Sequence, residues 1–169
     1  MWSTDATATQ TLERGQMTIF VAVDHCTAEC VGIHAAKPAT HSEVPEPIRQ
    51  GVRTMFGGFA AGVAAGLELR HDHGTQNMSD AFQSEIRLLG IASSPAFVRQ
   101  PEGNGCVERF MRTLKEQLLW LQNFRNLEEL RQALLVFQEQ YNEHWLIDRN
   151  EFRSLRQARP DFLAFGAAA

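Results

Sequence analysis

The feature that most constrains the fold is an almost unbroken apolar and β-branched run over residues 17–24 (MTIFVAVD). Apolar residues at successive positions are typical of a strand that is buried on both faces of a sheet. A second strand is predicted over residues 27–35, and the short connection Asp24-His25-Cys26 indicates an antiparallel hairpin. The core is therefore expected to form around a sheet that contains this hairpin.

Strands and helices alternate along the rest of the chain. Further strands are predicted within residues 1–9, 67–70 and 91–94. Helices are predicted at residues 42–56, 79–89, 104–121 and 127–142. This order predicts an α/β fold with a five-stranded mixed sheet flanked by helices, and 169 residues suffice for one such domain. After Asn142 the apolar pattern weakens, so a tail is expected there.

Composition limits the classes of function. Lys and Arg number 16 against 20 Asp and Glu, and the formal net charge of -4 argues against strong non-specific binding of nucleic acid. A chain of this charge would need local basic patches or metal ions to handle DNA. Three cysteines are too few for a disulfide framework and indicate a reducing, cytoplasmic compartment. No stretch is apolar and long enough to span a membrane, and no signal-peptide pattern begins the chain.

Three carboxylates stand at positions that packing alone does not explain. Asp5 lies in a predicted strand, where Asp is disfavoured. Asp72 follows a predicted strand, where α/β sheets place ligands, although an Asp two residues before Gly74 is also an ordinary turn former. Glu108 lies near the start of a predicted helix, where the helix dipole would also favour a solvated carboxylate.

These carboxylates and their flanking residues resemble the DDE transposases and integrases, specifically the integrase-type catalytic core of bacterial insertion-sequence transposases. The matching segments are residues 2–7 (WSTDAT), 21–24 (VAVD), 71–76 (HDHGTQ), 90–94 (GIASS), 101–105 (PEGNG), 108–116 (ERFMRTLKE) and 141–142 (YN). One such segment alone would be a weak signal, whereas all of them in order over most of the chain are a specific one.

The resemblance implies a ribonuclease-H-like fold, with residues 1–145 as the catalytic core and residues 146–169 as a basic C-terminal tail. It implies that Asp5, Asp72 and Glu108 are the catalytic residues and the metal ligands. Three carboxylates suit two Mg²⁺ or Mn²⁺ ions about 3.5–4 Å apart, as in enzymes that displace phosphodiester oxygens in line. The implied activity is divalent-metal-dependent DNA cleavage and strand transfer, the chemistry of transposition and DNA integration.

A DNA contact is expected along the helix that carries Glu108. Arg112 and Lys115 follow it by four and seven residues, so a helix places all three on one face. The family commonly has a basic residue seven places after its Glu, which implies that Lys115 contacts DNA, and the same role is expected for Arg112 and Asn104. The loop at residues 95–105 is expected to position the substrate.

The resemblance also implies partners. They are transposon-end and target DNA, further copies of the chain in a homodimer or higher oligomer, and a separate helix-turn-helix region or protein. The last expectation arises because Met1 lies only four residues before Asp5, which leaves no room for such a region ahead of it.

Alternative interpretations of individual residues stay open at this stage. Asp24 ends the apolar strand and either replaces Asp5 as the first metal ligand or starts the hairpin turn. His71 and His73 flank Asp72 and either support the metal site or are solvated. The tail arginines form either a DNA-backbone patch or an ordinary basic end; they are Arg149, Arg153, Arg156 and Arg159.

A zinc site is a further alternative, but its ligand spacing is unusual. The candidates are His25, Cys26, Cys30 and His34, which do not form the common pattern of a close Cys pair and a distant His pair.

Two rival functions are also considered. The first is a non-catalytic transposase remnant that only dimerises or binds DNA, and the second is a hydrolase of RNA–DNA hybrids.

Overall fold

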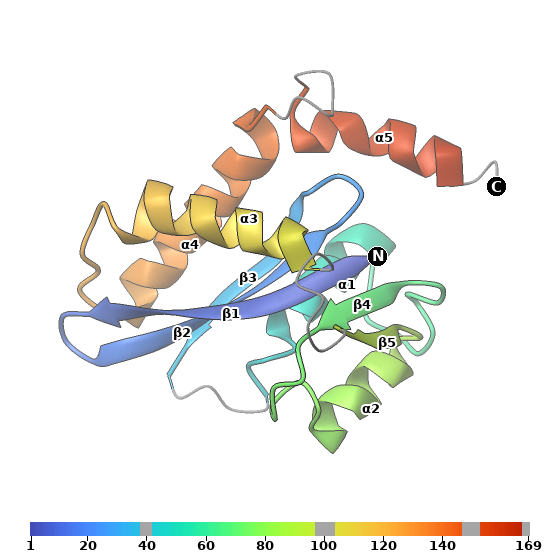
Figure 1. Ribbon diagram of the computed structural model, residues 1–169, viewed down its shortest axis with the longest axis horizontal. Helices are drawn as coiled ribbons and strands as arrows, with labels where there is room; N and C mark the ends of the chain where they lie inside the picture. Colours follow the sequence, from blue (N-terminus) through green and yellow to red (C-terminus); the bar gives the residue numbers. More distant parts are fainter. Residues whose placement is uncertain (38–41, 97–103, 147–152, 167–169) are drawn as a thin grey trace.

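The computed structural model describes residues 1–37, 42–96, 104–146 and 153–166, with side chains up to residue 160. It contains one five-stranded sheet in the order β3-β2-β1-β4-β5 (Figure 1). The strands are β1 Trp2–Thr11, β2 Gly15–Asp24, β3 Cys30–Ala36, β4 Glu68–His71 and β5 Ala92–Pro95. Neighbours among β1, β2 and β3 are antiparallel, whereas β4 runs parallel to β1 and to β5. The predicted mixed five-stranded sheet is thus confirmed.

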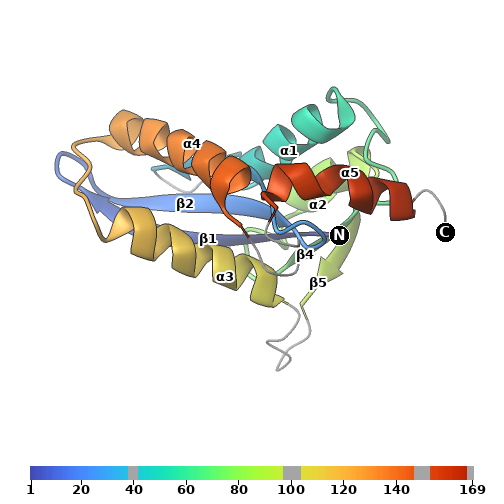
Figure 2. The same cartoon turned by 90° about the horizontal axis from the view of Figure 1, so that it is seen from above.

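Helices cover both faces of this sheet. They are α1 Glu46–Phe56, α2 Asp80–Leu88, α3 Gly105–Leu114, α4 Leu127–His144 and α5 Leu155–Gly166, and a π-helical turn, η2 Lys115–Leu119, continues α3. The two views in Figures 1 and 2 place α3 and α4 along the long β1–β2 hairpin. In the described residues no helix combines the length and the apolar character that crossing a membrane requires.

The β2 strand divides the core into two clusters, as a strand buried on both faces must. Alternate residues Met17, Ile19, Val21 and Val23 pack in a cluster with apolar side chains of α3 and α4. Phe20 and Ala22 point the other way and pack in a second cluster with α1 and α2. The unbroken apolar run of the sequence therefore serves two cores at once, and each helix pair buries its apolar stripe against one face.

Helix ends follow the chemistry of their residues. The Ser79 hydroxyl accepts a hydrogen bond from the Phe82 amide and so caps the start of α2. Pro47 lies in the first turn of α1, where its missing amide hydrogen is not needed. Gly57 then ends α1 with a left-handed φ of 77°, a conformation that glycine adopts without strain.

Asn142, on α4, fastens that helix to β3. Its side-chain oxygen accepts from the Cys30 amide at 3.0 Å, and its nitrogen donates to the Cys30 carbonyl at 2.9 Å. The Asn142 side chain is buried, and the pairing of β2 with β3 shifts register beside Cys30. The amide thus satisfies backbone groups next to an irregularity in the sheet.

Replacing Asn142 with Leu is expected to lower the free energy of unfolding by about 2–3 kcal/mol. The apolar side chain keeps most of the volume but leaves the buried Cys30 amide without its acceptor. Urea denaturation measures the change, with Gln140→Leu on the exposed face of α4 as control. Equal losses in both variants would mean that the hydrogen bonds of Asn142 contribute nothing specific.

The structure continues the fold past Asn142, where the sequence pattern predicts a tail. Leu155 and Ala158 in α5 are buried, and the guanidinium of Arg159 forms an ion pair with Glu29. Glu29 is only 1% exposed, so its charge requires this partner. The two buried apolar side chains of this basic helix give only a weak apolar pattern in the sequence. The acidic residue that pairs with Arg159 lies 130 residues away in sequence, so no local pattern indicates the pairing.

Among the described tail arginines, Arg156 and Arg159 form ion pairs within the fold. Arg159 pairs with Glu29, and Arg156 pairs with Glu139 and Glu143 on α4. These ion pairs favour a structural interpretation of both residues over a DNA-backbone patch. Arg149 lies outside the described residues.

Candidate active site

The register between β1 and β4 brings the first two carboxylates together. Ser3 on β1 lies opposite Arg70 on β4 in a parallel pair. Two residues further along each chain stand Asp5 and Asp72, which therefore emerge at the same level of the sheet. Both line one hollow together with the loop that follows β4. This is the carboxyl edge of parallel strands, where α/β sheets commonly place ligands.

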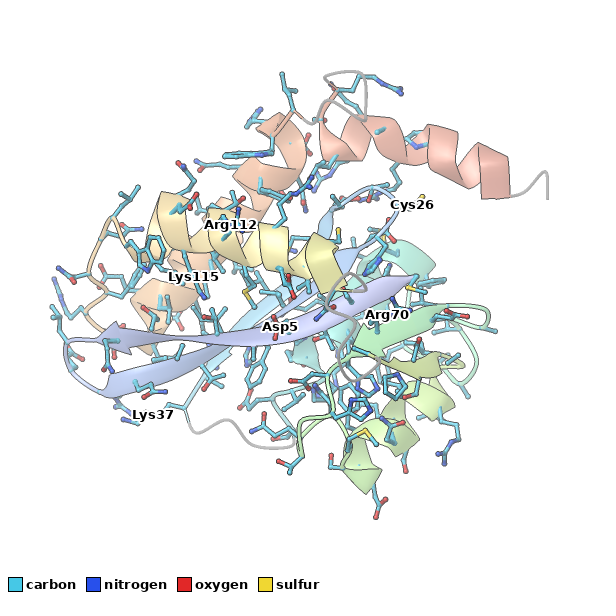
Figure 3. The ribbon with its side chains drawn as sticks, in the orientation of Figure 1. Asp5, Cys26, Lys37, Arg70, Arg112 and Lys115 are labelled. Carbon is cyan, nitrogen blue, oxygen red and sulfur yellow. The ribbon has the colours of Figure 1, made fainter. Side chains whose placement is uncertain are left out.

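Helix α3 brings the third carboxylate from the other side of Asp5. The side chains of β1 alternate, and those of Asp5 and Thr7 point toward α3. They line a second hollow of about 360 Å³ that Glu108, Arg112 and Lys115 also line. Figure 3 shows Asp5 on β1 beside the segment that carries Arg112 and Lys115. Asp5 thus belongs to both hollows and lies between Asp72 and Glu108.

The electrostatics of Asp5 reflect these neighbours. Burial raises the pKa of Asp5 above its ordinary value, and the negative charges of Asp72 and Glu108 raise it further. The Ala6 amide, which donates to the Asp5 carboxylate at 2.8 Å, and the positive charge of Lys115 lower the pKa in opposition. The Asp5 carboxylate is therefore repelled by carboxylates from two other segments, and a bound cation would relieve that repulsion.

The donor set fits a hard divalent cation, although the carboxylates are not gathered into ligand geometry. Among the described residues no three His, Cys, Asp or Glu side chains lie close enough to hold a metal as they stand. Asp72 Oδ1 accepts from the Gly74 amide and from Asn77, and no donor within the described chain bonds its second oxygen. Glu108 is exposed and has no hydrogen-bond partner in the same part of the chain. Both side chains thus keep oxygen atoms available, the ligand type that Mg²⁺ prefers.

His71 supports the Asp72 loop, which answers one question that the sequence leaves open. Its side chain is wholly buried, and Nδ1 lies 2.7 Å from the Asp72 carbonyl oxygen. Since a carbonyl can only accept, Nδ1 carries a proton and donates it, and Nε2 shares a hydrogen bond with the Ser93 hydroxyl at 2.8 Å. His73, in contrast, is exposed. Sequence reasoning could not separate the two, because both flank the same Asp.

Asp24 is a turn residue and is not part of this site. Its carboxylate accepts hydrogen bonds from the amide and the hydroxyl of Thr27, each at 2.9 Å, inside the β2–β3 hairpin. It lines a different hollow, which also contains Cys26 and Arg159. The turn interpretation of Asp24 is therefore the one that the structure supports.

The zinc alternative is not supported by the structure. Cys26 is exposed at the hairpin, away from Asp5 (Figure 3), whereas Cys30 is buried and its thiol donates to the Gly32 carbonyl. His34 bonds to Glu43 instead of to a cysteine. These side chains do not converge, in keeping with the lack of any three-residue ligand group within the described chain.

Sequence reasoning singled out Asn104, which lines neither hollow, but not Trp120, which lines one of them. Asn104 stands at the start of α3, and its side-chain oxygen is buried without a hydrogen-bond partner in the described residues. The rest of the loop expected to position the substrate, residues 97–103, lies outside the described residues. Trp120 was missed. Trp120 lines the same hollow as Asp5 and Glu108, although the DNA contact expected along this helix ended at Lys115.

Comparison with known proteins agrees with this architecture. Residues 89–146 match the family model described as an integrase core domain. Over 76 residues the chain is 33% identical to the transposase for insertion sequence element IS904 of Lactococcus lactis subsp. lactis. That match covers 45% of this chain and 30% of the transposase, so the chain spans less than a third of the curated relative.

Solved structures show the same fold at low sequence identity. The integrase catalytic core of BIV superposes with a TM-score of 0.69 at 18% identity, covering 98% of this chain and 97% of that one. A chain of the simian T-cell lymphotropic virus intasome gives 0.71 at 19%, covering 93% and 52%. The HTLV-2 integrase catalytic core in complex with magnesium gives 0.65 at 19%, covering 93% of both chains.

Residues 89–146 thus match an integrase core domain model, and the described fold is the ribonuclease-H-like fold of the integrase catalytic cores. Its likeness among the curated proteins is to an insertion-sequence transposase. The resemblance inferred from the sequence is thereby confirmed.

Proposed function

We propose that the chain is the catalytic core of a DDE transposase, which cleaves DNA and transfers strands with the help of divalent metal ions. One observation carries the proposal. Asp5 stands between a hollow that it shares with Asp72 and a hollow that it shares with Glu108 and two cations. Acidic groups for metal and basic groups for phosphate thus adjoin, as a site for a phosphodiester requires.

Asp5, Asp72 and Glu108 would hold Mg²⁺ or Mn²⁺, in our proposal two ions. Such ions activate the attacking oxygen and stabilise the leaving oxygen of an in-line displacement. Three carboxylates contribute three negative charges against four positive ones, so the loaded site attracts a phosphodiester. In support, the HTLV-2 core of the same fold was solved with magnesium.

The remaining side chains of the site orient the substrate and the ligands. Arg112 and Lys115 have no ion-pair partner in the described part of the chain and would contact DNA phosphates beside Glu108. Asn104, with its buried unpartnered oxygen, would be a further DNA contact. His71 acts through Asp72 and is a positioning residue, because it fixes the backbone of that residue.

We further propose that the working protein assembles with other chains. Element ends and target DNA must be held together for strand transfer, which favours a homodimer or higher oligomer, and a helix-turn-helix region or protein would recognise the ends. In support, the HTLV-2 core is described in dimeric and trimeric forms.

The test compares two chemically identical substitutions, Asp72→Asn and Asp80→Asn. Labelled duplex DNA with Mg²⁺ or Mn²⁺ is expected to yield cleaved and joined products with wild type and with Asp80→Asn, whose exposed side chain lies in the first turn of α2. Asp72→Asn is expected to lose more than about a hundredfold, since even outer partners of metal ligands contribute 10- to 100-fold.

Gel analysis of the products reads the result, and an RNA–DNA hybrid is included as a second substrate. Equal product from the two variants would overturn the proposal. DNA binding without metal-dependent cleavage in wild type would identify a non-catalytic remnant, whereas degradation of the hybrid alone would identify a hybrid hydrolase.

A further inference from the structure

Trp120 is an aromatic side chain in an unusual place. It is 70% exposed, although Leu118 and Leu119 directly before it are both buried at 8%. It lines the hollow that contains Asp5 and Glu108. Its indole is therefore available at the wall of the candidate active site instead of contributing to the core, and a large exposed aromatic surface commonly marks a binding site.

The π-helical turn explains how Trp120 reaches this wall. In a regular α-helix, residue 120 would be turned about 140° away from residue 115. The Trp120 amide instead bonds to the Lys115 carbonyl at 2.9 Å, a step of five residues, so Trp120 lies above Lys115. The extra residue in the turn thus places the indole on the face that carries Arg112 and Lys115.

The surroundings of Trp120 indicate the chemistry of its ligand. Arg112 and Lys115 present positive charge on the same wall, and within the described residues neither forms an ion pair with a carboxylate. Cations track a phosphate backbone, and an indole face stacks on a base. Inside a duplex both faces of a base are covered by its neighbours, so the indole can stack only on a terminal or an unpaired base.

We propose that Trp120 is a stacking platform for an unpaired base at the DNA end, with the phosphates of that strand held by Arg112 and Lys115. The inference rests on the proposed function, because it assumes DNA in the active site. It goes further by naming a local strand opening beside the carboxylates. An end that is opened there would present its backbone to the site without the complementary strand.

The experiment compares a blunt duplex with the same duplex ending in three unpaired nucleotides. Fluorescence anisotropy without divalent metal gives the affinity, and 2-aminopurine in the unpaired segment reports stacking by quenching. Wild type is expected to bind the frayed duplex more tightly and to quench the probe. Trp120→Ala is expected to weaken frayed binding by about 5- to 100-fold, as measured for single base–aromatic stacks, and to leave blunt binding within about twofold.

Two further variants make the result specific. Trp120→Phe keeps an aromatic face and is expected to retain most of the preference for the frayed end. Leu121→Ala removes an equally exposed apolar side chain, 71% exposed, and is expected to change neither affinity.

Failure of the inference and failure of the proposed function give different results. Frayed-end affinity and quenching that are unchanged in Trp120→Ala, with wild type still binding DNA, would overturn the stacking role alone. An equal loss on blunt and frayed DNA would also overturn it, because the indole would then contact duplex. If wild type binds neither the blunt nor the frayed duplex, even at low salt and high protein concentration, both the stacking role and the proposed function are overturned.

Discussion

Replacing Asp5 with Asn is expected to abolish metal-dependent cleavage and strand transfer while leaving the fold intact. Among the described residues, Asp5 is the carboxylate that lines both the hollow of Asp72 and the hollow of Glu108, so its loss removes a proposed ligand common to both. Asn keeps the shape and the oxygen that accepts from the Ala6 amide. The rate should fall by more than about a hundredfold, beyond the 10- to 100-fold effect of outer partners of metal ligands.

Stability is expected to change in the opposite direction. The pKa of Asp5 is raised in the fold by burial and by Asp72 and Glu108, so at neutral pH the ionised side chain disfavours the folded state. Neutral Asn removes that repulsion, and the melting temperature without metal should rise. With wild type, Mn²⁺ at a hundredfold excess over its dissociation constant should add about 2.7 kcal/mol of stability, and with Asp5→Asn much less.

Asp24→Asn is the matched control, because Asp24 is the other Asp of the β1–β2 hairpin. Its carboxylate binds the amide and hydroxyl of Thr27, away from the site. This variant should lose about 1–3 kcal/mol of stability and keep full activity. Calorimetry measures the stability of both variants, and gel assays measure their cleavage and strand-transfer activity. Full activity in Asp5→Asn would refute the assignment of Asp5, and lost activity in a folded Asp24→Asn would reopen the alternative ligand.

The β-sheet was within reach of the sequence for physical reasons, whereas the approach of the carboxylates was implied by the family resemblance. A short run of β-branched and apolar residues at successive positions favours a strand with a core on each face, and β2 has two such cores. Strand positions also repeat regularly, so a parallel pair fixes Asp5 and Asp72 at one level once Ser3 and Arg70 are paired. Local rules of this kind survive folding because tertiary contacts reinforce them.

Other features depended on contacts between distant residues or on local departures from regular geometry. No sequence period predicts the π-helical turn that carries Trp120 to the active-site wall, because it inserts one residue into an otherwise regular helix. Likewise α5 is held by the pairing of Arg159 with the buried Glu29, and neither residue alone indicates the other. His71 and Asn142 are further cases, since their roles consist of hydrogen bonds to backbone groups.

Gly32→Ala is expected to be among the most destabilising single substitutions in the chain. Gly32 lies on β3, where the first turn of α1 crosses it closely. A Cβ atom there would stand 1.9 Å from the Pro47 carbonyl oxygen and 2.7 Å from the Pro47 Cα. Both are backbone atoms, so no side-chain rotation relieves the overlap, and α1 must move away from the sheet.

The displacement of α1 would loosen one of the two cores. Ile48 and Val52 of α1 are fully buried against the sheet, and overpacking with a backbone shift costs about 3 kcal/mol or more. For a domain of this size that corresponds to a fall in melting temperature of about 10 °C. It is also a large share of the 5–15 kcal/mol that typically separates folded from unfolded states.

Gly58→Ala provides the control, since a Cβ atom at Gly58 meets nothing within 4 Å and its backbone is not left-handed. It should be neutral or stabilise by up to about 1 kcal/mol by restricting the unfolded chain. Thermal unfolding of both variants followed by circular dichroism separates the steric effect at Gly32 from a general effect of replacing glycine. If Gly32→Ala had the same melting temperature as wild type, α1 would not approach β3 as closely as described, and the position of α1 and α2 against the sheet would be contradicted.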